Sequence, residues 1–220
     1  MTALSGPERP AASGAADNLV ILLHGYGADG DDLIGLADPL APHLPGTAFI
    51  APNAPDPCAN NPAGFQWFPI PHLDGSSEAE SFLAAGKSFA MLNAWLDGVA
   101  RRFPPERTIL AGFSQGTMMA LQVGLRRAAP FAGIVGFSGR LLRPDRLAAE
   151  LTSPTPVLLI HGDADPMVPV GHLGEAADAL TAAGIETYTH VSQGVGHSID
   201  PEGLGLALRF IRDRLGVTKP

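Results

Sequence analysis

The residues best suited to chemistry in this chain are Gly112-Phe113-Ser114-Gln115-Gly116. They form a G-x-S-x-G pattern, which places a serine on a sharp turn between a strand and a helix. The two glycines remove side-chain collisions that such a strained turn would otherwise cause. Apolar runs at residues 108–111 and 117–125 predict the strand and the helix that flank the turn. We therefore expect Ser114 to be a catalytic nucleophile.

A serine hydroxyl is a weak nucleophile near neutral pH, so Ser114 needs a histidine base and a carboxylate that orients the histidine. In chains with this serine motif, the carboxylate and then the histidine follow the serine. Of the four histidines downstream of Ser114, only His197 lies in a glycine-rich loop after the last expected strand. We expect His197 to be the base, and we expect structural positions for His161, His172 and His190.

Two aspartates compete for the role of the carboxylate, because both follow the expected strand at residues 157–160. Asp163 directly follows a turn glycine and is able to accept N–H groups of its own loop, as in Asx turns. Asp165 precedes Pro166, which favours an extended backbone and directs the side chain away from the turn. The residues favour Asp165 and leave Asp163 as the alternative.

The oxyanion formed during acyl transfer needs two preorganised N–H donors. The backbone N–H of Gln115 is one expected donor, since Gln115 directly follows the nucleophile. The second donor must come from the turn after an early strand. Leu23-His24-Gly25-Tyr26-Gly27 is the only such segment whose glycines let the backbone approach a ligand closely. Spacing alone does not decide which N–H of this turn is used.

Apolar strands alternate with helices from residue 18 onward. Nearly continuous apolar strands in such an alternation predict an α/β fold, with a mostly parallel sheet covered by helices on both faces. Residues 1–17 show no periodicity and are expected to form a loosely ordered arm. Residues 18–220 are expected to form a single domain. The expected strands span 19–23, 48–51, 108–113, 133–137, 157–160 and 187–191, and the expected helices 31–40, 77–102, 117–125, 173–183 and 201–215.

Composition and charge narrow the class of protein. The formal net charge of −8 disfavours nucleic acid and anionic membranes as stable partners. The chain start lacks a signal-peptide pattern, no apolar run reaches membrane-spanning length, and the single Cys58 cannot form an intrachain disulfide. These features predict a cytoplasmic protein. The sequence contains no phosphate-binding glycine motif and no HExxH, so we expect no metal and no other cofactor.

Six segments in this order resemble the phospholipase/carboxylesterase family, which includes bacterial carboxylesterases and acyl-protein thioesterases. The resemblance covers about residues 18 to 215 and implies an α/β-hydrolase fold. It also implies Ser114 as nucleophile, Asp165 as acid, His197 as base, and the N–H groups of Leu23 and Gln115 as the oxyanion hole. Pro69 departs from the family, because many members carry an acidic residue there. The segments are residues 22–27, 51–55, 67–68, 112–116, 161–169 and 196–197.

The loop at residues 53–71 is too long for a simple connection inside a compact domain and is therefore expected to have a function. We expect Trp67, Phe68 and Ile70 to line the substrate pocket, with a small core under the loop as the alternative. The segment between Ser114 and Asp165 leaves no room for a cap domain. The site is therefore expected to be an open groove between this loop and the residues Met167 and Val168.

These observations predict a cofactor-free serine carboxylesterase that hydrolyses short- to medium-chain acyl esters. An acyl-protein thioesterase or a lysophospholipase would use the same chemistry and is the nearer alternative. A ligand-binding protein that has the fold without turnover is the more distant alternative, because fold does not imply function. A homodimer formed through an apolar face of the loop or of the closing helix is also considered.

Overall fold

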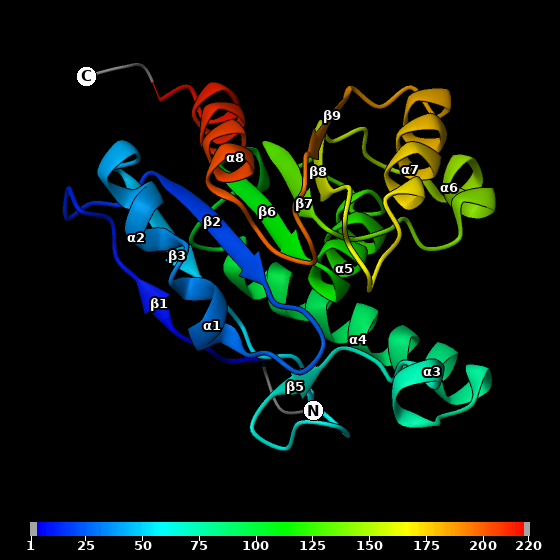
Figure 1. Ribbon diagram of the computed structural model, residues 1–220. Coiled ribbons are helices and arrows are strands. Elements are labelled where there is room, and N and C mark those ends of the chain that lie inside the picture. The colour runs from blue at the N-terminus through cyan, green and yellow to red at the C-terminus, as the bar shows by residue number, and fades with distance from the viewer. Residues whose placement is uncertain (1–3, 218–220) are drawn as a thin grey trace.

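Seven strands form the central sheet in the computed structural model, which describes residues 4–217 (Figure 1). Their order across the sheet is β1-β3-β2-β6-β7-β8-β9, and every neighbouring pair is parallel except β1 and β3. The sheet confirms the predicted mostly parallel α/β architecture. The strands are β1 (Glu8–Arg9), β2 (Asn18–Leu23), β3 (Thr47–Ile50), β6 (Thr108–Phe113), β7 (Gly133–Phe137), β8 (Val157–Gly162) and β9 (Thr187–Ser192).

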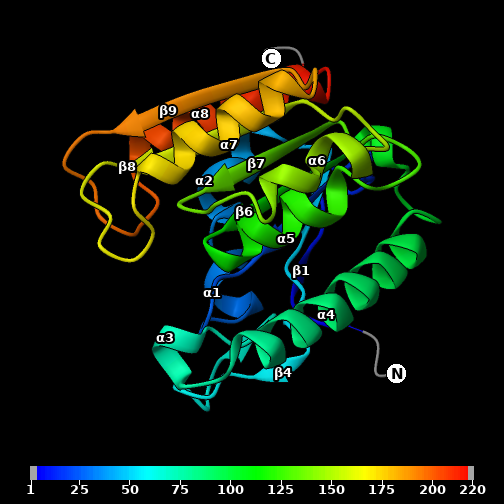
Figure 2. The same cartoon turned by 90° about the vertical axis from the view of Figure 1, so that its right-hand side faces the viewer.

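Helices cover both faces of the sheet, and the alternation of side chains along each strand divides the core in two. In β2, Leu19, Ile21 and Leu23 belong to one core, whereas Val20 and Leu22 belong to the other. The first core is covered by α4 (Glu78–Val99), α5 (Gln115–Gly124), α6 (Pro144–Glu150) and α7 (Gly171–Ala182), which face the viewer in Figure 2. The second is covered by α1 (Gly30–Ile34), α2 (Ala37–Leu40) and α8 (Pro201–Arg214).

Most predicted elements are present, with shifted ends. The helix expected at residues 31–40 is two short helices, α1 and α2, followed by the 3₁₀ turn η1 (Ala41–His43). The helix expected at 77–102 is α4, which begins after a capping box in which Ser77 and Glu80 each accept the other's backbone N–H. A second 3₁₀ turn, η2 (Pro105–Arg107), precedes β6. Within residues 4–217, no helix has the length and apolar character needed to span a membrane.

The described part of the N-terminal arm, residues 4–17, is held against the sheet, and this differs from the loosely ordered arm that we expected. Glu8–Arg9 pairs with β3, and the Ala51 N–H donates to the Pro7 carbonyl at 3.0 Å. Leu4 is buried. The arm covers backbone groups of β3 that an edge strand would leave unpaired. A two-residue strand has no detectable periodicity, so this pairing was not predictable from a local pattern.

The loop at residues 53–71 has secondary structure of its own, which the sequence did not predict. A two-stranded sheet joins β4 (Asp56–Pro57) to β5 (Phe65–Gln66), and α3 (Pro71–Asp74) follows the loop. The loop also pairs with the turn after β2, because the Gly27 N–H donates to the Phe65 carbonyl at 2.8 Å. The loop is thereby fixed beside the carboxyl ends of the central strands.

Candidate active site

Ser114 lies on the turn between β6 and α5, with φ 53° and ψ −114°, a conformation that non-glycine residues rarely adopt. Its N–H donates to the Phe137 carbonyl at 2.8 Å, which ties the turn to β7. A Cβ at Gly112 would lie 2.4 Å from the Gly116 carbonyl, and a Cβ at Gly116 would lie 1.8 Å from the Leu23 carbonyl oxygen. Both positions therefore require glycine, which explains the spacing of the motif physically.

Asp165 and His197 meet although they lie 32 positions apart, because the loops after β8 and β9 run side by side. His197 Nδ1 lies 2.7 Å from Asp165 Oδ2, and the Asp165 side chain is fully buried. Asp165 Oδ1 accepts the N–H groups of Met167 and Val168 at 2.8 and 2.9 Å. An ionised Asp165 orients the ring with Nδ1–H toward the carboxylate and leaves Nε2 free to accept a proton.

Two opposing effects set the pKa of Asp165. Burial on its own would raise this pKa. The hydrogen bonds from the Val168 N–H, from His197 and from the Met167 N–H outweigh burial, so the pKa of Asp165 is lowered. Asp165 is therefore a carboxylate at neutral pH, as an orienting acid must be.

Asp163 and His161 hold the two loops that carry Asp165 and His197. Asp163 Oδ1 accepts the Gly194 N–H at 2.6 Å, so Asp163 holds the loop that carries His197 and does not contact His197 itself. His161 is buried, and its Nε2 lies 2.8 Å from the Val168 carbonyl oxygen and 3.4 Å from Asp165 Oδ2. His161 thus fixes the turn that contains Asp165. A structural role for His161 was predicted from the sequence, but its contact with Asp165 was not, although the two residues lie four positions apart directly after the strand expected at residues 157–160.

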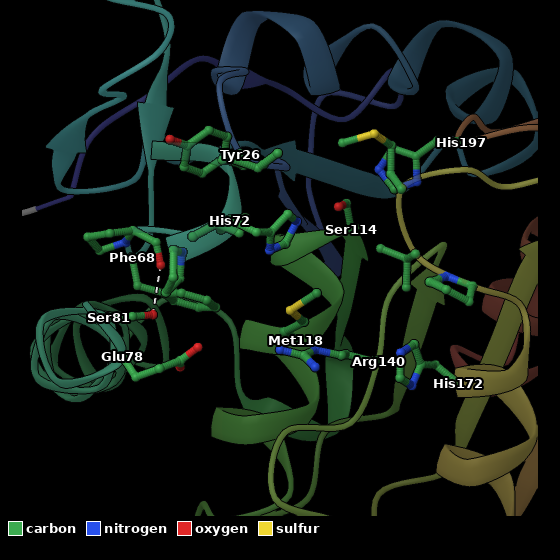
Figure 3. A pocket seen from close by; sticks show the side chains of 17 residues that line it. Tyr26, Phe68, His72, Glu78, Ser81, Ser114, Met118, Arg140, His172 and His197 are labelled. Carbon is green, nitrogen blue, oxygen red and sulfur yellow. Dashed lines mark hydrogen bonds between the residues drawn. The ribbon is translucent and has the colours of Figure 1, made fainter. Parts of the chain in front are cut away.

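A cavity of about 460 Å³ opens over Ser114 and His197 (Figure 3). Four of the five residues predicted for the pocket line it: Phe68, Ile70, Met167 and Val168. The other lining residues are Tyr26, Pro69, Pro71, His72, Leu73, Glu78, Ser81, Met118, Arg140, Pro169 and His172.

Trp67 does not line this cavity, which differs from the prediction. Its side chain is fully buried in the core, and its indole N–H donates to the His24 carbonyl at 3.0 Å. Phe68, the next residue, lies at the cavity instead. Trp67 therefore fixes the loop to the protein core. It fits the alternative considered for this loop, a small core under it, and not the pocket wall.

The Gln115 side chain also holds the loop at residues 53–71, through hydrogen bonds that were not predicted from the sequence. Gln115 is fully buried; its Oε1 accepts the Trp67 N–H and its Nε2 donates to the Phe68 carbonyl, both at 2.8 Å. Ser88 Oγ donates to the Trp67 carbonyl, and Ser81 Oγ donates to the Pro69 carbonyl at 2.7 Å. An amide at the start of a largely apolar helix was the available signal, because buried polar groups are nearly always hydrogen-bonded.

The two backbone donors predicted for the oxyanion lie in different settings. Gln115 is the first residue of α5, where N–H groups have no partner within the helix. Leu23 is fully buried at the end of β2, in register with Gly112, and does not line the cavity. Tyr26 does line it. A Cβ at Gly25 would lie 3.3 Å from Ser114 Cβ, so the turn after β2 lies against the nucleophile.

His24 gives this turn its shape. Its Nδ1–H donates to the Gly25 carbonyl at 2.7 Å, and its Nε2 accepts the Ala54 N–H at 2.9 Å. Burial lowers the pKa of His24, so the ring stays neutral and keeps one donor and one acceptor. His24 is therefore a structural residue of the turn.

A parallel sheet with a serine turn after β6 and a carboxylate–histidine pair after β8 and β9 defines the α/β-hydrolase fold. The family model described as phospholipase/carboxylesterase matches residues 9–215. The chain therefore belongs to the phospholipase/carboxylesterase family, a family of hydrolases that act on ester bonds.

Individual relatives support the assignment. The chain is 27% identical over 212 residues to the esterase YpfH of Escherichia coli, covering 95% of this chain and 86% of that protein. It is 32% identical over 183 residues to acyl-protein thioesterase 1 of Gibberella zeae, covering 76% and 77% of the two chains. The crystal structure of esterase PE8 superposes with a TM-score of 0.92 at 46% identity and covers 97% of this chain and 100% of that one.

Proposed function

We propose that this protein is a serine carboxylesterase that hydrolyses short- to medium-chain acyl esters through an acyl-enzyme. One observation carries the proposal. Ser114, on its strained turn, and His197, held by the ionised Asp165, face the same cavity. A serine, a histidine and a buried carboxylate in this arrangement supply the complete machinery for acyl transfer.

In the proposed mechanism, Ser114 Oγ attacks the acyl carbonyl carbon while His197 Nε2 takes the hydroxyl proton. Asp165 stabilises the imidazolium that forms. The tetrahedral intermediate then collapses, the bond to the alcohol breaks, and His197 gives its proton to the departing alcohol. His197 next takes a proton from a water molecule, the hydroxide attacks the acyl-enzyme, and the carboxylic acid is released as Ser114 regains its proton.

For the oxyanion hole, we propose the N–H groups of Gln115 and Tyr26. Gln115 is the donor predicted from the sequence, and Tyr26 takes the place of the predicted Leu23 in this proposal. The burial of Leu23 within the sheet and the presence of Tyr26 in the cavity lining support this change. The two donors would then approach the acyl oxygen from α5 and from the turn after β2, which preorganises them before the reaction.

The replacement of Ser114 by alanine tests the proposal. With p-nitrophenyl acetate and butyrate as substrates, Ser114→Ala is expected to lower kcat by about 10⁴-fold or more, because no other group can form the acyl-enzyme. Ser13→Ala, an exposed serine outside the cavity, is the matched control and is expected to keep full activity. Turnover by folded Ser114→Ala at the wild-type rate would refute the assignment.

Thioesterase or lysophospholipase activity is the second candidate, and the 32% identity to an acyl-protein thioesterase favours including it. Comparing kcat/KM on acyl thioesters, lysolipids and simple esters of matched acyl length ranks these activities. Tight retention of an ester without product would instead favour the non-catalytic binding protein. Full activity in excess EDTA is expected, since the proposed steps use only side chains and backbone N–H groups.

Three expectations from the sequence remain predictions. Subcellular fractionation tests the cytoplasmic location, and sedimentation analysis tests the homodimer. A vesicle-binding assay tests the prediction that the protein does not associate stably with membranes.

A further inference from the structure

We propose that Arg140 recognises a carboxylate on the substrate, so that the enzyme favours esters that carry a second, ionised acid group over neutral esters of the same size. This inference rests on the proposed esterase function and narrows its substrate class. It comes from the position of Arg140 beside Ser114, from its lack of an ion pair, and from the distribution of charge in the cavity.

The backbone that leads to Arg140 is fixed against the nucleophile. Ser138, with φ 47°, donates its N–H to the Ile160 carbonyl at 2.9 Å. A Cβ at Gly139 would lie 2.4 Å from Thr117 Cβ and 2.9 Å from the Ser114 carbonyl oxygen. Arg140 directly follows Gly139, whose backbone packs against Ser114. The Arg140 side chain lines the cavity, as does that of Met118 (Figure 3).

Arg140 has no carboxylate partner and no hydrogen-bond acceptor among the described residues. Several other arginines do form ion pairs: Arg126 with Glu150 at 2.9 Å, Arg127 with Asp97 at 2.7 Å, and Arg214 with Glu186 at 2.6 Å. None of these three lines the cavity over Ser114. Arg140 thus offers its guanidinium donors to whatever occupies the cavity.

The remaining charges of the cavity favour an anion near Arg140. Arg140 is the only lysine or arginine in the lining, and Glu78, at the start of α4, is the only acidic residue. His172 lies near Arg140 in Figure 3 and is paired with Glu175 at 2.8 Å. Glu78 and Arg140 form no ion pair with each other, and they come from separate elements. An anionic substrate group is therefore attracted to the Arg140 side and repelled from the Glu78 side.

A carboxylate is the anion that this arrangement suits best. The planar guanidinium donates two parallel N–H bonds to a carboxylate, which gives geometric selectivity as well as attraction. Phe68, Ile70 and Met118 line the same cavity and reduce the contact of a bound ester with water. The Arg140 side chain is itself exposed to solvent, so we expect the selectivity to come from the paired N–H geometry more than from the strength of the charge attraction.

The test compares pairs of esters that differ in one charge. Mono-4-nitrophenyl glutarate and its methyl-capped diester place the charge on the acyl side. 4-Carboxyphenyl acetate and its methyl ester place it on the alcohol side, so the two pairs show from which side the carboxylate reaches Arg140. The measured quantity is the ratio of kcat/KM for the charged ester to kcat/KM for the neutral ester.

Arg140→Gln is expected to lower this ratio on the order of tenfold in at least one pair, because a charge-assisted hydrogen bond is lost. Arg140→Lys keeps the charge but not the paired donors. Its ratio is expected to lie between the ratios of the wild type and of Arg140→Gln. Glu78→Gln removes the repulsion and is expected to raise the ratio. Arg143→Gln, an exposed arginine outside the cavity lining, is the matched control and is expected to leave the ratio unchanged.

The inference would be overturned if, in both pairs of esters, Arg140→Gln changed the ratio no more than Arg143→Gln does. Arg140 would then be a solvated surface residue. The proposed esterase function would survive that result, provided that Ser114→Ala abolishes turnover of the neutral esters. Turnover that persists in Ser114→Ala would overturn the esterase function itself, whatever the ratio shows. The two failures are therefore distinguishable.

Discussion

The two sides of the cavity are held by different kinds of interaction. On the side of the nucleophile, backbone contacts dominate, with Gly112 and Gly116 packed against neighbouring strands and turns at distances that exclude any Cβ. On the opposite side, the loop at residues 53–71 combines backbone pairing to the turn after β2 with hydrogen bonds from the side chains of Gln115 and Ser88. The difference shows that the backbone alone fixes the serine turn, whereas the substrate-facing loop also depends on particular side chains.

The largest expected effect is the loss of kcat when a catalytic residue is replaced. His197→Ala removes the proposed base and is expected to lower kcat on p-nitrophenyl butyrate by about 10⁴-fold or more. It also removes a hydrogen bond to the buried Asp165, so the free energy of unfolding is expected to fall as well. His197 is partly exposed, with a side-chain exposure of 20%, so its removal empties little of the core. The measurement is steady-state kinetics together with a denaturant unfolding curve.

His190→Ala is the matched control for this change. His190 lies in β9, outside the cavity over Ser114, and its replacement is expected to leave kcat within twofold of wild type. Activity of His197→Ala comparable to that of His190→Ala would contradict the assignment of His197 as the catalytic base.

The next largest effect is on the opposite side, where Gln115→Ala is expected to act through stability. Removing this side chain leaves the buried Trp67 N–H and Phe68 carbonyl without partners, at a cost of about 1–3 kcal/mol for each. The free energy of unfolding is therefore expected to fall by about 2–6 kcal/mol, measured by denaturant titration. The Gln115 backbone N–H remains, so kcat is expected to change less than KM.

Two further variants sharpen this prediction. Ser88→Ala removes one hydrogen bond to the Trp67 carbonyl and is expected to cost about 1 kcal/mol. Gln122→Ala, in the same helix, is the control, because Gln122 Oε1 has no hydrogen-bond partner in the structure and its loss is expected to cost less than either change. Equal costs for Gln115→Ala and Gln122→Ala would contradict the role assigned to Gln115.

The contrast between the two sides also explains what the sequence predicted well. The strands, most helices and the serine turn follow from local patterns: apolar runs, a capping box and glycines at positions where the backbone leaves no space. The approach of Asp165 to His197 followed from their places after successive parallel strands, since the carboxyl ends of such strands lie at one edge of the sheet.

What the sequence did not predict depends on distant partners. The hydrogen bonds of Gln115 to the loop join residues 47 and 48 positions apart, and no local pattern marks them. Trp67 and Phe68 are adjacent and both apolar, so composition alone did not distinguish the buried residue from the one at the cavity. The pairing of Glu8–Arg9 with β3 and the β4–β5 hairpin are too short to leave a periodic signal.

The proposed mechanism requires Ser114 to be the residue that becomes acylated. Mass spectrometry after treatment with a fluorophosphonate, which reacts with activated serines, detects this residue. We expect one adduct per chain, on the peptide that contains Ser114, and no adduct in Ser114→Ala or, at matched times, in His197→Ala. A stoichiometric adduct on any other residue, or labelling of Ser114 that does not depend on His197, would contradict the proposed mechanism.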